Sequence, residues 1–294
     1  MGAGPILVTG GTGQLARALA EAAGERPLLV VGRPQFDFDR PESLLEPLRA
    51  AAPALVVNAA AYTAVDKAES EAAAAWRANR DGPAAIAGWC AAAGVPLIHI
   101  STDYVFDGLK GAPYVEDDPT NPTGVYGASK LAGEQAVLAA GAPALVLRTA
   151  WVYAATGRNF VLTMLNAARK TNRVRVVADQ VGCPTAASDL AEAILAIADR
   201  LLAQGWNPAW GGIYHACGAG ETTWHGLAVA AFEEAAKRGL RRPTVAPIAT
   251  SDWPTPARRP PDSRLDCSKL VNVFGIRLPA WQDGLSRTVE QIAL

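Results

Sequence analysis

Short apolar runs alternate with alanine-rich segments along the first half of the chain, and this alternation constrains the fold more than any other feature. The apolar runs are rich in Val, Ile and Leu and are bounded by Gly, Pro or Ala, which is typical of buried strands. They are PILVTG (5–10), PLLVVG (27–32), ALVVNAA (54–60), PLIHIST (96–102) and ALVLRTA (144–150). The segments between them, such as QLARALAEAAG (14–24), have the apolar spacing of helices. Because strands without a polar face must be covered on both sides, the pattern predicts an α/β fold with a doubly wound, parallel, Rossmann-type sheet.

The first apolar run leads into a glycine-rich turn, TGGTGQLA (9–16). Gly10, Gly13 and Ala16 follow the spacing G-x-x-G-x-x-A, directly between a strand and a helix. Small residues there let the backbone approach a pyrophosphate, and the helix points its free N–H groups and positive dipole end at the phosphates. A strand before and a helix after the turn favour a dinucleotide site over an ordinary tight turn.

The later part of the chain differs from the first in composition and in the alternation of its apolar runs. A chain of 294 residues has room for a large α/β domain and a smaller lobe. From about residue 200, Trp and Pro become frequent, as in QGWNPAWGGIY (204–214), and the alternation loosens. We therefore predict a dinucleotide-binding Rossmann domain in residues 1–150 and a mainly substrate-binding lobe in residues 151–294. Parts of 170–200 and 240–255 are expected to return to the first domain.

Charge and hydropathy exclude several classes of function. The formal net charge is −1, so no overall field attracts nucleic acid or an anionic membrane surface. The apolar runs are far shorter than the ~20 residues that cross a bilayer. The start, MGAGPILVTGG (1–11), has no basic segment before its apolar run, so we interpret it as the first strand and not as a signal peptide.

The cysteines indicate a reducing environment. The chain has four, far apart and without a C-x-x-C pair: Cys90, Cys183, Cys217 and Cys267. In a chain of this size the pattern predicts reduced thiols in a cytoplasmic protein. His215 and Cys217 resemble half of a metal site, but ligand clusters normally repeat and no second half follows. We therefore predict no metal.

The end of the second strand bears on the choice of cofactor. NAD sites usually place Asp or Glu there to bind the ribose 2′-hydroxyl, whereas this chain has Gly32 and Arg33. An arginine can bind a 2′-phosphate through a charge-assisted, bidentate contact. Two interpretations of Arg33 stay open, a phosphate contact and an ordinary solvated loop residue. We expect NADPH or NADH as the cofactor, with NADPH used at least as well.

A tyrosine and a lysine lie one helical turn apart in VYGASK (125–130). Tyr126 and Lys130 have the spacing i, i+4, which places them on one helix face, and the small residues between them leave room for a cofactor ring. A tyrosine donates a proton well only if its pKa of about 10 falls toward the working pH, and a nearby ammonium favours the phenolate. Downstream of a dinucleotide turn, the pair predicts a catalytic face.

These two features belong to a series of motifs that spans nearly the whole chain. The others are NAAAYTAVDKAES (58–70), STDYVFDG (101–108), RTAWVYA (148–154) and PTPARRPPDSRL (254–265). Together the motifs resemble the dTDP-4-dehydrorhamnose reductases, which are extended members of the short-chain dehydrogenase/reductase superfamily. The last two motifs are the narrower ones and support this family over related nucleotide-sugar enzymes.

The resemblance implies roles for individual residues. Tyr126 would donate a proton, Lys130 would support it electrostatically, and Thr102 would bind the reacting carbonyl. The residues implied at the cofactor are Gly10, Gly13, Gln14 and Leu15 beside the diphosphate, Asp37 and Phe38 beside the adenine, and Ala61, Tyr62 and Thr63 along the nicotinamide half, with Arg33, Tyr126 and Lys130. The residues implied at the sugar are Thr102, Asp103 and Trp151, and Asn79 would support the site. Asp103 as a turn cap, Asn79 as a helix hydrogen bond and Trp151 as a core residue stay open as alternatives.

The arginines of the last motif suit an anionic ligand. Arg258, Arg259 and Arg264 stand in a proline-stiffened loop, PTPARRPPDSR (254–264). Guanidinium groups held in this way fit a nucleotide diphosphate, and the prolines reduce the entropy lost on ordering. We predict Arg258 and Arg259 as substrate residues, against the alternative of a solvated basic loop.

The resemblance implies NAD(P)H-dependent reduction of the 4-keto group of dTDP-4-dehydro-L-rhamnose, giving dTDP-L-rhamnose. Two alternatives stay open: a nucleotide-sugar epimerase or dehydratase, and a non-catalytic subunit like the regulatory subunit of methionine adenosyltransferase. STDYVFDG offers no glutamate for the first, and the intact tyrosine–lysine pair disfavours the second. We expect a monomer or homodimer with a small-molecule substrate. The metal that bridges some dimers of this family is not expected, because the first helix has no acid before Glu21.

Overall fold

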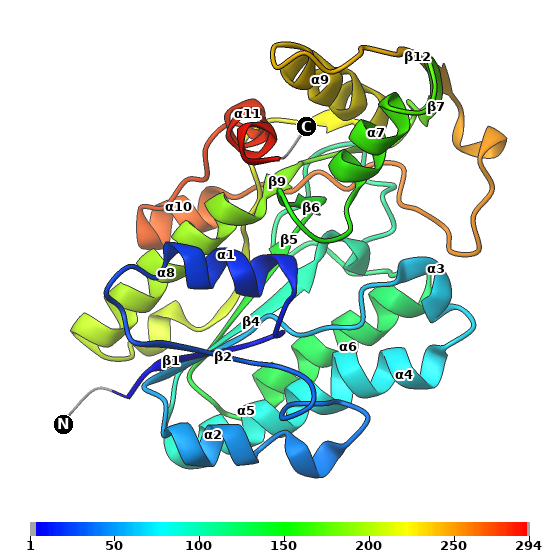
Figure 1. The fold of residues 1–294 in the computed structure, drawn as a ribbon. Helices are drawn as coiled ribbons and strands as arrows, with labels where there is room; N and C mark the ends of the chain where they lie inside the picture. The colour runs from blue at the N-terminus through cyan, green and yellow to red at the C-terminus, as the bar shows by residue number, and fades with distance from the viewer. Residues whose placement is uncertain (1–3, 293–294) are drawn as a thin grey trace.

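A six-stranded, wholly parallel sheet forms the centre of the computed structural model, which describes residues 4–292 (Figure 1). Its strand order is β10-β5-β4-β3-β1-β2. The strands are β1 (Ile6–Thr9), β2 (Leu28–Val31), β3 (Leu55–Asn58), β4 (Leu97–Thr102), β5 (Ala144–Thr149) and β10 (Gly212–His215). The order changes direction between β1 and β3, and in sheets of this kind the carboxyl ends of the strands at such a point form a ligand crevice. The predicted doubly wound sheet is confirmed.

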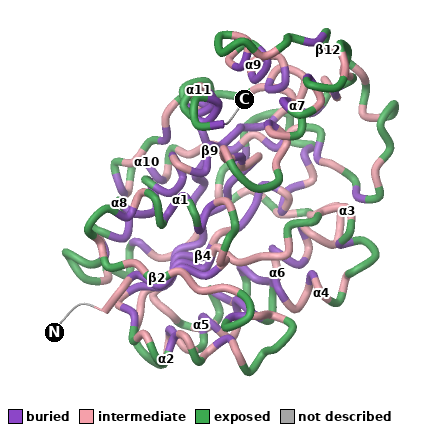
Figure 2. The backbone as a smooth tube through the Cα atoms, in the orientation of Figure 1, coloured by how far each residue is buried: buried purple, intermediate pink, exposed green. Residues whose placement is uncertain are grey.

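Helices cover both faces of this sheet. On one face lie α1 (Gln14–Ala22), α8 (Ala187–Gln204) and α10 (Ser268–Phe274). On the other lie α2 (Glu46–Ala51), α5 (Gly82–Ala93) and α6 (Val125–Ala139). Alternate residues of one strand enter the two cores: Ile6 and Val8 pack toward α1 and α8, and Leu7 packs toward α2 and α5. The central strands are therefore buried on both faces (Figure 2).

Short helical elements complete the sheet domain. The loop after β3 leads through α3 (Val65–Ala68) and α4 (Ala72–Trp76) into the π-helical turn η2 (Arg77–Asp81). The 3-10 turns are η1 (Pro41–Ser43), η3 (Asp103–Val105), η4 (Pro208–Trp210) and η5 (Thr250–Asp252). No helix in the described part of the chain has the length and apolarity that a bilayer crossing needs.

A smaller lobe lies beyond the carboxyl edge of the sheet (Figure 1). Its helices are α7 (Phe160–Ala168), α9 (Trp224–Ala236) and α11 (Trp281–Gln291), which share a separate hydrophobic core. Its strands pair two by two: β7 (Arg173–Val177) with β12 (Thr244–Ile248), β8 (Val181–Gly182) with β11 (Thr222–Thr223), and β6 (Val152–Tyr153) with β9 (Thr185–Ala186). The segments with looser alternation divide between this lobe and the sheet domain, because QGWNPAWGGIY (204–214) runs into η4 and β10.

The late segments divide between the two parts of the molecule. Helix α8 packs against α1 on the face of the main sheet. Strand β12, within the predicted return segment 240–255, pairs with β7 and not with the main sheet. The late strand that does join the main sheet is β10, which pairs with β5.

Candidate active site

Buried polar side chains join the central strands near their carboxyl ends. The Thr9 hydroxyl donates to Asn58 Oδ1 at 2.6 Å, and Asn58 Nδ2 donates to His99 Nδ1 at 3.0 Å. Burial lowers the pKa of His99 well below its usual value, so the imidazole is neutral and can accept this bond. Thr9 Oγ1 also accepts from the backbone N–H of Ala60 at 3.1 Å. These hydrogen bonds therefore hold in place the chain segments that follow β1 and β3.

The glycine-rich turn is built from close backbone contacts. Gly10 and Gly11 have φ of 113° and 53°, which side chains rarely allow. A Cβ on Gly32 would lie 2.5 Å from the Gly11 Cα, so the end of β2 can pass the turn only as glycine. Gly13 precedes α1, and no side chain in the described chain caps that helix. This cradle and the uncapped N–H groups fit a dinucleotide diphosphate.

Gln14 and Leu15, predicted beside the diphosphate, point in different directions. Leu15 is buried in the core between α1 and the sheet. The Gln14 side chain accepts from Asn159 Nδ2 at 2.7 Å. Asn159 begins α7, where its own Oδ1 accepts from the backbone N–H of Leu162. Gln14 thus joins the cofactor turn to the smaller lobe.

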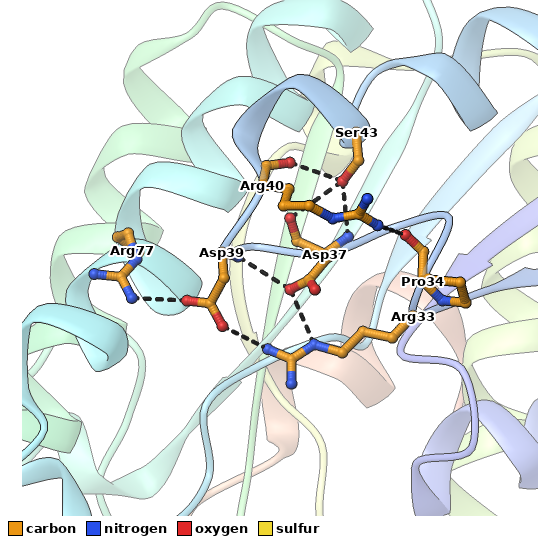
Figure 3. Close-up of polar contacts among 7 residues, drawn as sticks. All are labelled: Arg33, Pro34, Asp37, Asp39, Arg40, Ser43 and Arg77. Carbon is orange, nitrogen blue, oxygen red and sulfur yellow. Dashed lines mark hydrogen bonds and ion pairs between the residues drawn. The ribbon is translucent and has the colours of Figure 1, made fainter.

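At the end of β2, the predicted cofactor residues form an ion-pair network (Figure 3). Arg33 donates from Nε to Asp37 Oδ1 and from Nη2 to Asp39 Oδ2, both at 2.9 Å. Arg77, from η2, donates to the other oxygen of Asp39 at 2.7 Å. Arg33 stays 68% exposed, so it is a surface cation already paired with carboxylates. Phe38 lies farther in, against Gly82 at the start of α5.

Asn79 fastens the loop that was predicted to lie along the nicotinamide half. Its Oδ1 accepts from the backbone N–H of Tyr62 at 2.8 Å, and its Nδ2 donates to Tyr62 O at 3.1 Å. Nδ2 also lies 3.0 Å from Ser129 Oγ in α6. Ala61 and Thr63, on either side of Tyr62, are partly or fully exposed. Asn79 stands in a π-helical turn, a feature often found at functional sites.

The small residues between Tyr126 and Lys130 have a different purpose from the one predicted. A Cβ on Gly127 would lie 2.2 Å from the carbonyl oxygen of Tyr104. Ser129 donates to the carbonyl of Tyr126. The small side chains thus admit neighbouring protein backbone, and the expectation that they make room for a cofactor ring is wrong for Gly127.

Tyr126 and Lys130 lie near the carboxyl end of β4. Lys130 is 2% exposed, and its Nζ donates to the carbonyl of Ile100 at 2.6 Å. Tyr126 packs edge-on against Tyr104, with ring centroids 5.4 Å apart. The Thr102 hydroxyl donates to Asp103 Oδ1 at 3.0 Å, and it also lies within hydrogen-bonding reach of the Tyr126 phenol. The catalytic residues predicted from the sequence are therefore brought together.

The protonation states of this pair differ from the expectation. Burial raises the pKa of Tyr126 to about 12, although the hydrogen bond from Thr102 acts in the opposite direction. Burial lowers the pKa of Lys130 to about 8, and Glu134 partly offsets the fall. The expected lowering of the phenol pKa by the ammonium is not found, because desolvation is the largest effect on Tyr126 and Lys130 is not among the groups that shift its pKa. Near neutral pH the phenol keeps its proton and the lysine keeps its charge.

Two buried polar atoms next to this group have no hydrogen-bond partner among residues 4–292. They are Asp103 Oδ2 and Thr149 Oγ1, and Thr149 pairs with Thr102 across β5 and β4. Burial raises the pKa of Asp103 to about 6, while hydrogen bonds from Ser263 and Thr102 lower it. Buried polar atoms normally have partners, so these two mark a place suited to a polar ligand.

Trp151 forms an aromatic stack above β5. Its φ is 47°, a strained value for a non-glycine residue, and its ring stacks on Trp224 with centroids 3.5 Å apart. Trp224 Nε1 donates to Gln180 Oε1 at 3.1 Å. Sequence reasoning identified Trp151 but missed Trp224 and Gln180. The only available signal was the high frequency of tryptophan in the smaller lobe.

The arginines of the proline-rich loop take separate positions. Arg259 Nη2 donates to Asp66 Oδ2 of α3 at 2.9 Å, so the loop reaches back to the sheet domain (Figure 1). Arg264 is paired with Asp262 and Glu221. Arg258 is exposed, with no polar partner in the described part of the chain. Of these three arginines, Arg258 is therefore the one whose side chain is free to bind an anion.

Among residues 4–292, no three His, Cys, Asp or Glu side chains are grouped so as to hold a metal ion. His215, singled out in the sequence, instead places Nδ1 3.0 Å from the carbonyl of Tyr114. The chemistry of the site rests on the phenol, the ammonium and the hydroxyl.

Comparison with known proteins agrees with this geometry. Residues 4–294 match the family described as the RmlD substrate binding domain. The dTDP-4-dehydrorhamnose reductase of Sinorhizobium fredii is 47% identical, over 98% of this chain and 98% of its own length. That of Escherichia coli is 42% identical, over 98% of this chain and 97% of its own length. A Bacillus anthracis dTDP-4-dehydrorhamnose reductase solved in complex with NADP is 31% identical, with a TM-score of 0.89 over 98% of this chain and 99% of that one. The motif-based resemblance is confirmed, and the chain belongs to the RmlD substrate binding domain family.

Proposed function

We propose that this protein is an NAD(P)H-dependent reductase that converts dTDP-4-dehydro-L-rhamnose to dTDP-L-rhamnose. The observation that carries the proposal is the meeting of Tyr126, Lys130 and Thr102 at the carboxyl end of β4, on the sheet that bears the glycine cradle. The names of the full-length relatives support the same substrate.

Each of the three residues has a distinct task. A reduced nicotinamide, when bound, supplies the hydride for the sugar carbonyl. Tyr126 holds a proton at Oη and delivers it to the oxygen that gains negative charge. Thr102 Oγ1 donates a hydrogen bond to the same oxygen, and Lys130 contributes positive charge from behind. A phenol with a pKa of about 12 still transfers its proton downhill to an alkoxide, which is a stronger base.

Two groups of residues at the crevice indicate the kind of cofactor. The glycine cradle fits a diphosphate, and Arg33 and Arg77 provide cations near the end of β2. The NADP complex of the B. anthracis relative supports the use of NADPH. For the substrate, Asp103 Oδ2 and Thr149 Oγ1 are the free polar atoms and Trp151 is the adjacent ring. Among the arginines of the proline-rich loop, Arg258 is the one left unpaired for the dTDP diphosphate.

A direct test follows oxidation of NADPH at 340 nm with dTDP-4-dehydro-L-rhamnose, together with chromatography of the sugar product. Stoichiometric formation of dTDP-L-rhamnose is the expected result. Interconversion of nucleotide sugars without net cofactor oxidation would identify an epimerase or dehydratase. Cofactor binding without any turnover would identify a non-catalytic binding subunit.

A further inference from the structure

Three of the four cysteines lie together, although they are far apart in the sequence. Cys183 stands between β8 and β9, Cys217 follows β10, and Cys267 immediately precedes α10. The Sγ atoms of Cys217 and Cys267 are 3.4 Å apart. Cys183 hydrogen-bonds Cys217 on its other side. Cys90 is separate and buried inside α5.

A cavity gives this cluster access to small molecules. Its volume is about 270 Å³, and the residues that line it include all three cysteines together with Arg264 and Arg277. Cys267 is partly exposed, whereas Cys217 is buried behind it. Among the described residues, these cysteines and their neighbours do not form a group of His, Cys, Asp or Glu that could hold a metal ion. Cys267 is therefore the thiol that a small reagent can reach first.

We propose that Cys217 and Cys267 are a redox-active thiol pair that forms a reversible disulfide by exchange with a small disulfide such as glutathione disulfide. The Cys267 thiolate attacks one sulfur of the reagent, forms a mixed disulfide and expels one glutathione thiolate. The departing glutathione thiolate takes the proton of the buried Cys217, Cys217 Sγ attacks Cys267 Sγ, and the second glutathione leaves and takes up the proton that Cys267 had lost. Two protein thiols are oxidised, and one glutathione disulfide is reduced to two glutathione molecules.

The geometry requires little movement. A disulfide has an S–S bond of about 2.05 Å, so the two sulfurs must approach by a little more than an ångström. Cys267 precedes the first residue of α10, so its backbone is outside the regular helix, and its Sγ is already 3.4 Å from Cys217 Sγ. In proteins of reducing compartments, disulfides of this kind are usually transient and redox-sensing.

The bond would join two segments that frame the active site. The chain just before Cys267 is held by backbone bonds in which Tyr114 N donates to Arg264 O and Asp266 N donates to Tyr114 O, both at 2.8 Å. Ser263, in the same stretch, hydrogen-bonds the buried Asp103. A Cys217–Cys267 bridge would anchor this stretch covalently to the end of β10.

The test compares the reduced protein with protein incubated with glutathione disulfide, under non-denaturing conditions. We expect free thiols to fall from four to two per chain and a peptide map to contain one cross-link, between Cys217 and Cys267. Dithiothreitol should restore all thiols. The cross-link closes a long loop, so the oxidised protein should melt about 5–10 °C higher.

Three variants separate the possible outcomes. Cys217→Ser and Cys267→Ser should each abolish the cross-link and the gain in Tm, while Cys90→Ser, the matched control, should keep both. Cys217→Ser should stop at the mixed disulfide on Cys267, seen as one glutathione added to the intact mass. A Cys183–Cys217 cross-link, or four unreacted thiols in the folded protein, would overturn the proposal.

Discussion

At the scale of single residues, the protonation state of Tyr126 decides whether it can donate the proton that completes the proposed reduction. Its phenol is protonated at neutral pH because burial raises the pKa to about 12, which is the state that a proton donor needs at the start of a reduction. Lys130, with a pKa of about 8, is charged below that pH and loses its charge above it. The pair is set for proton delivery near neutral pH, and alkaline solution should remove the support of the lysine first.

Tyr126→Phe tests the phenol as the acid. The ring and its packing on Tyr104 remain, so folding and cofactor dissociation constants should be nearly unchanged. Loss of a positioned acid should lower kcat by roughly 10²–10⁴. Lys130→Met should lower kcat and also weaken cofactor binding. Steady-state kinetics and fluorescence titration with NADPH measure both effects, and a Tyr126→Phe enzyme with more than about a tenth of normal activity would exclude Tyr126 as the acid.

The buried carboxylate of Asp103 should lower the free energy of unfolding, because its Oδ2 has no hydrogen-bond partner among the described residues. Its pKa is raised from 3.8 to about 6, so the folded state holds the proton more tightly than the unfolded state. The resulting cost is fully present above about pH 6 and is relieved as the pH falls toward 4. Asp103→Asn should therefore raise the unfolding free energy by about 1–3 kcal/mol at pH 7.5, with little gain near pH 4.

Urea unfolding at the two pH values measures this difference. Asp107 is a matched control of opposite sign, because hydrogen bonds from Leu109 N, Asn121 and Tyr114 lower its pKa. Asp107→Asn should destabilise the protein at pH 7.5. If Asp103→Asn also destabilised it there, the carboxylate of Asp103 would be a stabilising group and the free oxygen would have a partner.

At the scale of elements, we expect the loop after β2 to influence the choice between NADPH and NADH. Asp39 occupies both Arg33 and Arg77 (Figure 3), so a 2′-phosphate would compete with this carboxylate for the two cations. Arg33→Ala should raise the KM for NADPH about tenfold, the scale of one charge-assisted contact, and leave the KM for NADH almost unchanged. Asp39→Asn should lower the KM for NADPH. Equal changes for both cofactors would make Arg33 an ordinary loop residue.

The elements also differ in how far the sequence could predict them. The glycine turn and the Tyr126–Lys130 face were predictable because each depends on neighbours within one turn of the chain. The stack of Trp151 on Trp224 was not, because the two rings come from segments far apart in the sequence that meet only in the folded lobe. The pKa of Tyr126 was mispredicted for a related reason: spacing reveals the nearby lysine, whereas burial depends on the whole fold. The pairing of Arg259 with Asp66 likewise joins segments from opposite ends of the chain.

At the scale of the whole molecule, the candidate active site lies at the carboxyl end of β4, where α6 begins, and the smaller lobe has a hydrophobic core separate from that of the sheet domain. One core lies between the main sheet and α1 and α8, and the other joins α7, α9 and α11. Two contacts that cross from one part to the other, Gln14 with Asn159 and Asp66 with Arg259, are polar. Polar contacts exchange readily with water, so these two can be replaced when a nucleotide sugar binds.

The last prediction is that turnover needs no metal. The reaction proposed here uses a phenol, a hydroxyl and an ammonium of one chain, and α1 has no acid in its first turn to share a cation with a second copy. Activity with NADPH should therefore be the same in EDTA as in Mg²⁺, with kcat and KM unchanged within error. Size-exclusion chromatography in both solutions should likewise give one unchanged elution volume. Strict dependence of turnover on Mg²⁺, or dissociation of an active dimer by EDTA, would mean that acids outside α1 bind a bridging ion between copies of the chain.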